Sequence, residues 1–149
     1  MVKAAKAPRI YLDSNVYIAF LNGGDSDQAP IAADLMRSLR AGDVVAIAIA
    51  SELVRVEVSG KDGVGAEEAA ALLSDANIEW SPVDRRVAEL ARRFVVERKL
   101  KPADAIHLAT ASLRSAEAVM TWDDRFCKAA NTSELPVRVP GPVGQGRLV

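Results

Sequence analysis

The sequence predicts an α/β fold in which a central, mainly parallel sheet is covered by helices on both faces. Short apolar runs alternate along the chain with longer segments in which apolar residues recur at helical spacing. This alternation is typical of parallel α/β sheets. The length of 149 residues suits one domain, because most domains contain roughly 100–150 residues. We therefore expect a single domain over residues 1–149, with its core at about residues 9–139.

Five apolar runs of strand length supply the predicted sheet. Each is bounded by polar or turn residues, and none is long enough for a typical helix. The predicted strands span residues 9–12, 44–50, 78–83, 118–121 and 137–139.

Between the strands, apolar residues recur three and four positions apart, as they do on one face of a helix. Ser51 and Asp84 are candidate N-caps, and Pro102 suits a first helical position. Gly42 and Gly60 are expected to end helices. The predicted helices span residues 15–21, 29–40, 51–60, 67–76, 84–95, 102–113 and 124–130.

The composition predicts a folded cytoplasmic protein. Half of the residues are hydrophobic and 26% are charged, which argues against intrinsic disorder. The lone Cys127 cannot form an internal disulfide, and the sequence contains neither a secretory leader nor a run of ~20 apolar residues that could span a membrane. The formal net charge of −1 lacks the basic footprint of general nucleic-acid binders. The Gly- and Pro-containing tail at 140–149 is expected to be flexible.

Four acids stand where apolar segments meet polar ones: Asp13, Glu57, Asp104 and Asp123. Asp13 and Asp123 follow predicted strands, and the carboxyl ends of parallel strands open into one crevice. Each acid alone has an ordinary structural explanation, as a helix cap, a first-turn charge or a solvated helix residue. Four carboxylates together repel one another unless a positive group lies between them. Oxygen ligands favour Mg²⁺ or Mn²⁺ over Zn²⁺, so the sequence predicts a divalent-metal site.

Four segments that contain these acids resemble the motifs of PIN-domain nucleases. They are Tyr11–Val16, Ser51–Glu57, Pro102–Ala109 and Thr121–Asp123. Their order and the short chain are similar to those of VapC-type toxins of bacterial toxin–antitoxin pairs. The resemblance implies a three-layer α/β/α PIN fold and a Mg²⁺- or Mn²⁺-dependent endoribonuclease that hydrolyses RNA through a metal-activated water. It also implies a homodimer silenced by an antitoxin.

By the same resemblance, Asp13, Glu57, Asp104 and Asp123 are the catalytic and metal-binding residues. Asn15 and Thr121 are expected to support them. Two neighbours compete for these places. Asp124 adjoins Asp123, but the spacing from Thr121 favours Asp123; Glu52 competes with Glu57, but it lies too early relative to Leu53.

Two lysines, a histidine and a cysteine lie close in sequence to these acids. Lys99 and Lys101 lead into Asp104 and are candidates for binding RNA, although either could belong to a solvated helix face. His107 is interpreted as a packed or hydrogen-bonded helix residue, because an activated water makes a histidine base unnecessary. Cys127 is interpreted as a small buried hydrophobe.

The alternatives to an RNase toxin are a PIN-fold nuclease acting on other RNA or on DNA, and an inactive PIN-like binding module. A phosphatase of the haloacid-dehalogenase type is disfavoured, because it requires a second Asp where this chain has Asn15.

Overall fold

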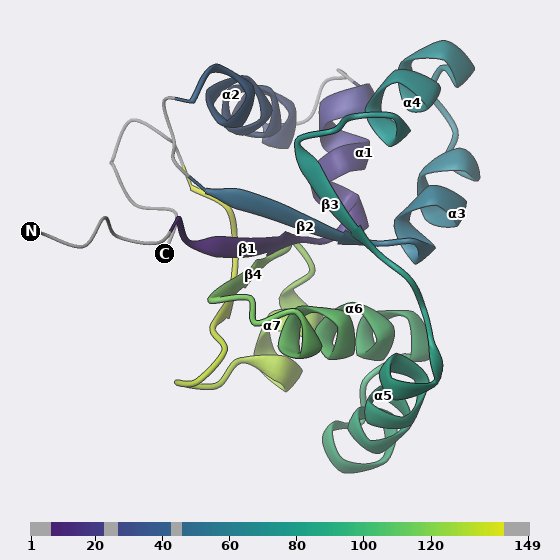
Figure 1. Cartoon of the computed structure of the whole chain (residues 1–149), viewed down its shortest axis with the longest axis vertical. Coiled ribbons are helices and arrows are strands. Elements are labelled where there is room, and N and C mark those ends of the chain that lie inside the picture. Colours follow the sequence, from purple (N-terminus) through teal and green to yellow (C-terminus); the bar gives the residue numbers. More distant parts are fainter. Residues whose placement is uncertain (1–6, 23–26, 43–45, 142–149) are drawn as a thin grey trace, which may run out of the picture.

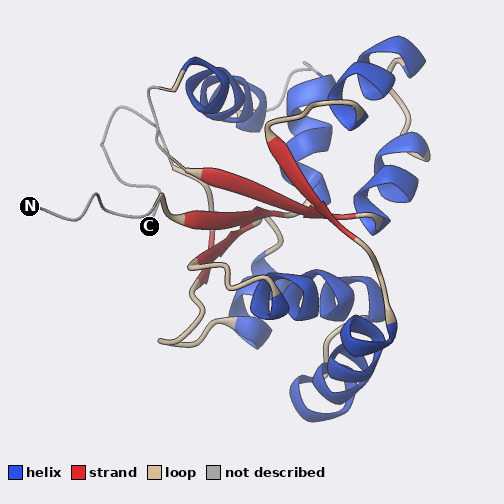
Figure 2. Ribbon diagram, in the orientation of Figure 1, coloured by secondary structure: helices blue, strands red, loops and turns tan. Residues whose placement is uncertain are grey.

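Five parallel strands form one sheet in the order β3-β2-β1-β4-β5 in this computed structural model (Figures 1 and 2). The structure describes residues 7–22, 27–42 and 46–141. The strands are β1 (Arg9–Leu12), β2 (Ile47–Ser51), β3 (Ile78–Ser81), β4 (Ala118–Met120) and β5 (Val137–Arg138). The predicted parallel α/β sheet is confirmed.

Helices cover both faces of this sheet, which gives the predicted three layers (Figure 2). One face carries α1 (Ser14–Asn22), α2 (Gln28–Ala41), α3 (Leu53–Ser59) and α4 (Ala66–Leu73). The other carries α5 (Arg85–Arg98), α6 (Pro102–Leu113) and α7 (Asp124–Ala130). Among the described residues, no helix is both long and apolar enough to cross a membrane.

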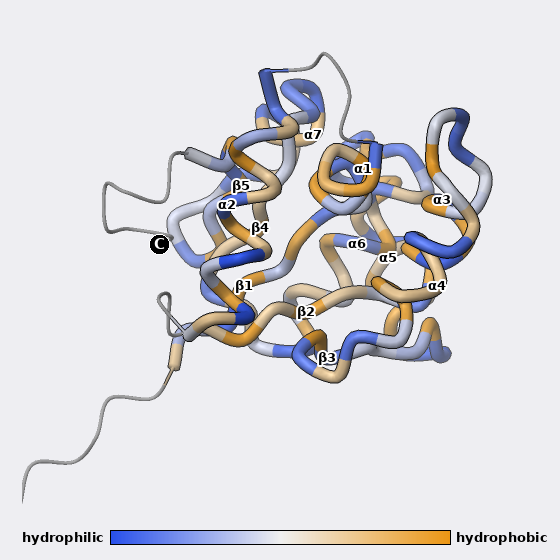
Figure 3. The backbone as a smooth tube through the Cα atoms, turned by 90° about the horizontal axis from the view of Figure 1, so that it is seen from above, coloured by the Kyte–Doolittle hydropathy of each residue, from blue (hydrophilic) through white to orange (hydrophobic). Residues whose placement is uncertain are grey.

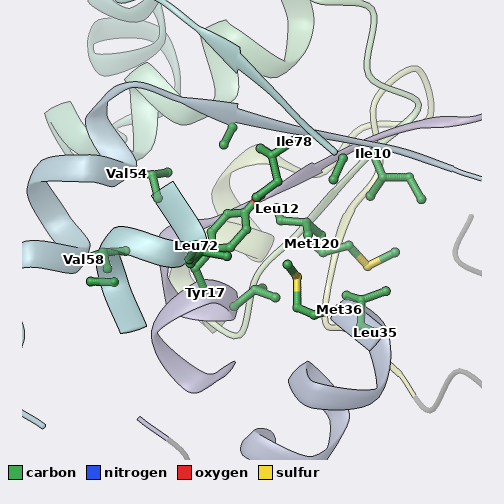
Figure 4. Close-up of a cluster of buried hydrophobic side chains, with 14 residues drawn as sticks. Ile10, Leu12, Tyr17, Leu35, Met36, Val54, Val58, Leu72, Ile78 and Met120 are labelled. Atoms are coloured by element: carbon green, nitrogen blue, oxygen red, sulfur yellow. The ribbon is translucent and has the colours of Figure 1, made fainter. Parts of the chain in front are cut away.

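The pleat of β1 divides its side chains between two hydrophobic cores. Ile10 and Leu12 pack on the side of α1 to α4 with Tyr17 and Leu72, as Figure 4 shows. Tyr11 points to the opposite side, toward α5, α6 and α7. Successive side chains of a strand point to opposite faces, so this arrangement follows from the strand geometry. It also places the hydroxyl of a buried tyrosine on the α6 side.

The local sequence explains most of the element boundaries. Asp84 caps α5 as predicted, since its carboxylate accepts a hydrogen bond from the Val87 N–H at 3.0 Å. Helix α1 follows β1 almost at once, and its largely apolar residues give it tan and orange colours in Figure 3. It can therefore bury most of its surface against the sheet and the neighbouring helices α2 and α3.

Several predicted boundaries were wrong. β3 ends at Ser81, before residue 83, and α5 continues to Arg98, beyond residue 95. Ser51 is not the N-cap of α3: it ends β2, and its hydroxyl accepts a hydrogen bond from the Leu53 N–H at 3.1 Å, while Glu52 occupies the N-cap position. Helix α4 stops at Leu73, short of residue 76. Just beyond it, the Asp75 carboxylate accepts from the Asn77 N–H at 2.8 Å, a local turn that competes with helix.

Parts of two other predictions lie outside the described residues. These are the beginning of the second strand at 44–45 and the tail from residue 142 onward.

Candidate metal-binding active site

The predicted acids lie around the carboxyl edge of the sheet, next to its central strand. From β1 the chain builds β2 and β3 on one side, then returns through α5 and α6 to build β4 on the other. Asp13 directly follows β1 and Thr121 directly follows β4, and the Asp13 N–H donates to the Met120 carbonyl at 3.0 Å. Parallel sheets bind ligands at such a reversal of strand order, outside the strand ends.

Asp13 is the most buried of these acids, with 4% of its surface exposed. Its Oδ1 accepts from the Ser14 N–H at 2.8 Å, and its Oδ2 accepts from the Thr121 hydroxyl at 2.8 Å. The Asn15 amide donates to Thr121 Oγ1 at 2.8 Å and lies 3.4 Å from Asp13 Oδ2. Asn15 and Thr121 therefore fix the orientation of Asp13 through these hydrogen bonds.

His107 lies between two of the acids. Its Nε2 is 2.6 Å from Glu57 Oε1 and 3.3 Å from Asp13 Oδ1, and the residue is 1% exposed. Burial lowers the pKa of His107, but the hydrogen bond to Glu57 and the negative charges of Asp13, Glu57 and Asp104 outweigh burial and raise that pKa overall. The prediction of a packed, hydrogen-bonded histidine is confirmed.

Asp104 belongs to the same electrostatic cluster. Burial, followed by the negative charges of Asp13 and Asp123, raises the pKa of Asp104 from 3.8 to about 6. His107 and Lys101 oppose this rise only in part. The negative charges of Asp13 and Asp123 therefore act on Asp104, which lies in the first turn of α6.

In the structure, the side chains of Asp123 and Glu57 have different surroundings from those of Asp124 and Glu52, the neighbouring acids that could take their places in the sequence motifs. Asp123 caps α7, because its Oδ1 accepts from the Phe126 N–H at 3.1 Å, and its charge also reaches Asp104. Asp124 points outward and pairs with Lys128 at 2.9 Å. Glu52 forms an ion pair with Arg55 on the surface of α3.

The donor chemistry of the acids fits a divalent cation. The four carboxylates offer oxygen ligands, which Mg²⁺ and Mn²⁺ prefer. Among the described residues, no three His, Cys, Asp or Glu side chains converge closely enough to enclose an ion as they stand. Glu57 is turned toward His107 and Asp123 toward the end of α7. Burial is the main cause of the raised pKa of Asp104, and the negative charges of Asp13 and Asp123, which a cation would offset, come second.

A cleft of about 250 Å³ adjoins Asp104 and Asp123. Lys99 and Lys101, in the turn from α5 to α6, contribute to its wall together with Arg125. Lys99 has a φ of 57°, a left-handed conformation in which glycine is the favoured residue. The predicted lysines thus lie beside the acids, and Arg125 joins them.

Sequence reasoning missed Tyr11, whose hydroxyl is 2.5 Å from His107 Nδ1. A tyrosine in a buried strand and a histidine in a helix both need hydrogen-bond partners when they are buried. That requirement was the signal that could have paired them. Cys127 is only partly buried, against the core on the side of α5 to α7, and not fully buried as predicted. Burial, followed by the charges of Asp124 and Asp123, raises the pKa of its thiol.

A family model for the PIN domain matches residues 10–131. The chain belongs to the PIN domain family. The match includes Asp13, Glu57, Asp104 and Asp123, and it confirms the resemblance seen in the sequence motifs. No curated protein matches the chain at a significant level.

Solved structures share this PIN fold. VapC20 from Mycobacterium tuberculosis, a toxin that cleaves the sarcin-ricin loop, has a TM-score of 0.64 and 22% identity, with 80% of this chain and 94% of VapC20 covered. A toxin–antitoxin complex from Klebsiella pneumoniae has a TM-score of 0.62 and 24% identity, and the match covers 89% of this chain and 98% of the Klebsiella chain. VapBC2 from Rickettsia felis, bound to a promoter DNA fragment, has a TM-score of 0.59 and 13% identity, and the match covers 87% of this chain and 96% of the Rickettsia chain.

Proposed function

We propose that this PIN domain is a Mg²⁺- or Mn²⁺-dependent endoribonuclease and the toxin of a toxin–antitoxin pair. The observation that carries the nuclease proposal is the cluster of Asp13, Glu57 and Asp104 around His107, with Asp123 electrostatically coupled to Asp104. Membership of the PIN family supports the same chemistry. The fold shared with VapC20 and with toxin–antitoxin complexes supports the biological role.

In this proposal the four carboxylates hold the divalent ion, with Asp13 fixed by Thr121 and Ser14. A bound ion would supply an activated water for attack on phosphorus and positive charge for the developing negative oxygens. Asp104 must be ionised to contribute, and its pKa of about 6 makes its charge sensitive to neutral and mildly acidic pH. Single-stranded or looped RNA suits the site, because an unstacked backbone reaches recessed acids more readily than a duplex does.

The proposal is tested by incubating the purified chain with a single-stranded RNA and with DNA of the same sequence. RNA cleavage should require Mn²⁺ or Mg²⁺ and stop in EDTA. Cleavage of DNA alone would favour the alternative of a DNA nuclease. Failure to cleave any RNA or DNA, in either metal, would favour a binding module.

Lys99 and Lys101 are proposed to bind RNA phosphates in the cleft beside Asp104. In the double variant Lys99→Gly, Lys101→Ala, the slope of log affinity against log salt should become less negative by about 1.4, because each phosphate contact on a single strand contributes about −0.7. Glycine relieves the left-handed backbone at position 99, so stability should not fall.

A matched control for backbone relief is Ser115→Gly. Ser115 also has a φ of 57°, but it lies between α6 and the beginning of β4, at the opposite edge of the sheet. This control should leave RNA binding unchanged. An unchanged salt slope in the lysine double variant would assign both lysines to a solvated helix face.

We also propose an antitoxin partner and a homodimer. A groove of about 250 Å³ is lined by Phe20 and Leu21 of α1, Arg40 of α2, and Ala71 and Leu72 of α4. An amphipathic segment of an antitoxin could place apolar residues in this groove. Light scattering on the purified chain would establish the oligomeric state.

A further inference from the structure

Tyr11 and His107 form a buried hydrogen-bonded chain that ends at two of the acids. The Ser51 N–H donates to Tyr11 Oη at 3.2 Å, and Tyr11 Oη lies 2.5 Å from His107 Nδ1. On the other side of the ring, Nε2 faces Glu57 at 2.6 Å and Asp13 at 3.3 Å. Tyr11 is 0% exposed. This series of hydrogen bonds connects β2, β1, α6 and α3.

Counting the protons along these hydrogen bonds indicates that Nε2, the ring nitrogen that faces the acids, carries a hydrogen. A tyrosine hydroxyl has one hydrogen and can accept as well. Because Tyr11 Oη accepts from Ser51, its hydrogen is available for His107 Nδ1. The Nε2 of a neutral ring then carries the other proton. A doubly protonated ring also carries a proton on Nε2, so the acids face a donor in both states.

The tyrosine keeps its hydrogen over the working range of pH. A tyrosine hydroxyl ordinarily loses its hydrogen only near pH 10. Its hydroxyl therefore remains able to donate to Nδ1. This donated hydrogen bond disfavours the tautomer of His107 in which a bare Nε2 lone pair would face two carboxylates.

Glu57 is the acid that most needs such a partner. It lies on the seven-residue helix α3, and 28% of its side chain is exposed. Among the described residues, Glu57 accepts no hydrogen bond from a neighbouring backbone N–H or hydroxyl, unlike Asp13, and His107 is its hydrogen-bond partner. Long side chains lose considerable rotamer entropy when they are fixed. Without His107, Glu57 would be free to turn toward solvent.

We propose that His107, aimed by Tyr11, is a positioning residue that holds Glu57 and Asp13 together so that a divalent cation meets a preformed pair of ligands. This inference rests on the proposed metal-dependent function. It assigns no proton transfer to His107. Partners that orient metal ligands typically contribute about 10–100-fold to metal affinity or activity.

Tyr11→Phe tests the proposal because it changes no group that touches the acids. Its affinity for Mn²⁺, measured by titration calorimetry, should fall by about tenfold. Tyr17→Phe is the matched control. Tyr17 is also 0% exposed, but its hydroxyl has no hydrogen-bond partner among the described residues. The control should bind Mn²⁺ like the wild type.

Kinetics separate positioning from a purely structural role. In Tyr11→Phe the Mn²⁺ concentration for half-maximal cleavage should rise, while saturating Mn²⁺ should restore kcat. His107→Gln keeps an N–H donor on a side chain of similar reach and should lose less Mn²⁺ affinity than His107→Leu.

Equal Mn²⁺ affinities for Tyr11→Phe, Tyr17→Phe and the wild type would overturn the positioning role and leave the proposed function intact. A folded wild-type chain that binds no Mn²⁺ would overturn both.

Discussion

Asp104→Asn should reduce RNA cleavage by about a hundredfold or more. The substitution removes one carboxylate of the proposed metal site and nearly preserves side-chain size. A bound metal ion contributes several kcal/mol of transition-state stabilisation, and each ~1.4 kcal/mol corresponds to a factor of ten in rate. Cleavage of a labelled RNA at saturating Mn²⁺ measures the loss.

The same variant should be more stable than the wild type when metal is removed with EDTA. The folded-state pKa of Asp104 is about 6, above its ordinary 3.8, so the folded chain holds this proton more tightly than the unfolded chain does. The favourable contribution is present at low pH and is lost as the pH rises through about 6. The excess melting temperature of Asp104→Asn should therefore be near zero at pH 4 and grow by pH 7.

Asp124→Asn is the matched control for both measurements. Asp124 is an aspartate in the first turn of a helix, as Asp104 is, but it is exposed and pairs with Lys128. It should cleave RNA normally and show no such rise in relative stability. Normal cleavage by Asp104→Asn together with loss in Asp124→Asn would contradict the site assignment.

Mn²⁺ should weaken the binding of the antitoxin by about tenfold. We expect the partner to place a cationic side chain, most naturally Arg, among Asp13, Asp104 and Asp123, where its planar fork can bind a carboxylate with two hydrogen bonds. Metal and partner would then compete for one cluster of charge. A tenfold change lies within the usual range of coupling between two ligands.

The experiment uses this chain purified in complex with the antitoxin that the proposed function requires, which we expect to be a small protein encoded by the neighbouring reading frame. Mn²⁺ is titrated in, and partner affinity is measured for the wild type and for the double variant Asp13→Asn, Asp104→Asn. The double variant should lose the response to metal. A wild-type affinity that ignores Mn²⁺ would show that the partner acts elsewhere, for example by covering the path of RNA.

The sequence predicted the parts of the fold and site that depend on local pattern. Asp13 follows an apolar run and Asp104 lies in the first turn after Pro102, so strand and helix signals were enough to find them. The sheet edge that gathers them follows from parallel topology. The choice between Asp123 and Asp124 was made from motif spacing, and the structure supplies its physical basis through the orientation of α7.

Features that depend on distant contacts were not predictable in this way. Tyr11 and His107 are 96 residues apart, and their pairing requires that α6 pack against the face of β1 to which Tyr11 points. Ser51 was misplaced because a serine next to a helix can bond a nearby N–H without occupying the N-cap position. The left-handed backbone of Lys99 has no local sequence signal, because glycine is the residue expected there.

A crystal structure grown with Mn²⁺ would test the claim that these acids form one divalent-metal site. We expect an anomalous scattering peak that touches carboxylate oxygens of Asp13 and Asp104, with Glu57 and Asp123 completing its surroundings directly or through water. The peak should disappear in Asp104→Asn or weaken strongly. At saturating Mn²⁺, the absence of a peak at this edge of the sheet, or a peak only on exposed acids such as Asp124, would contradict the claim.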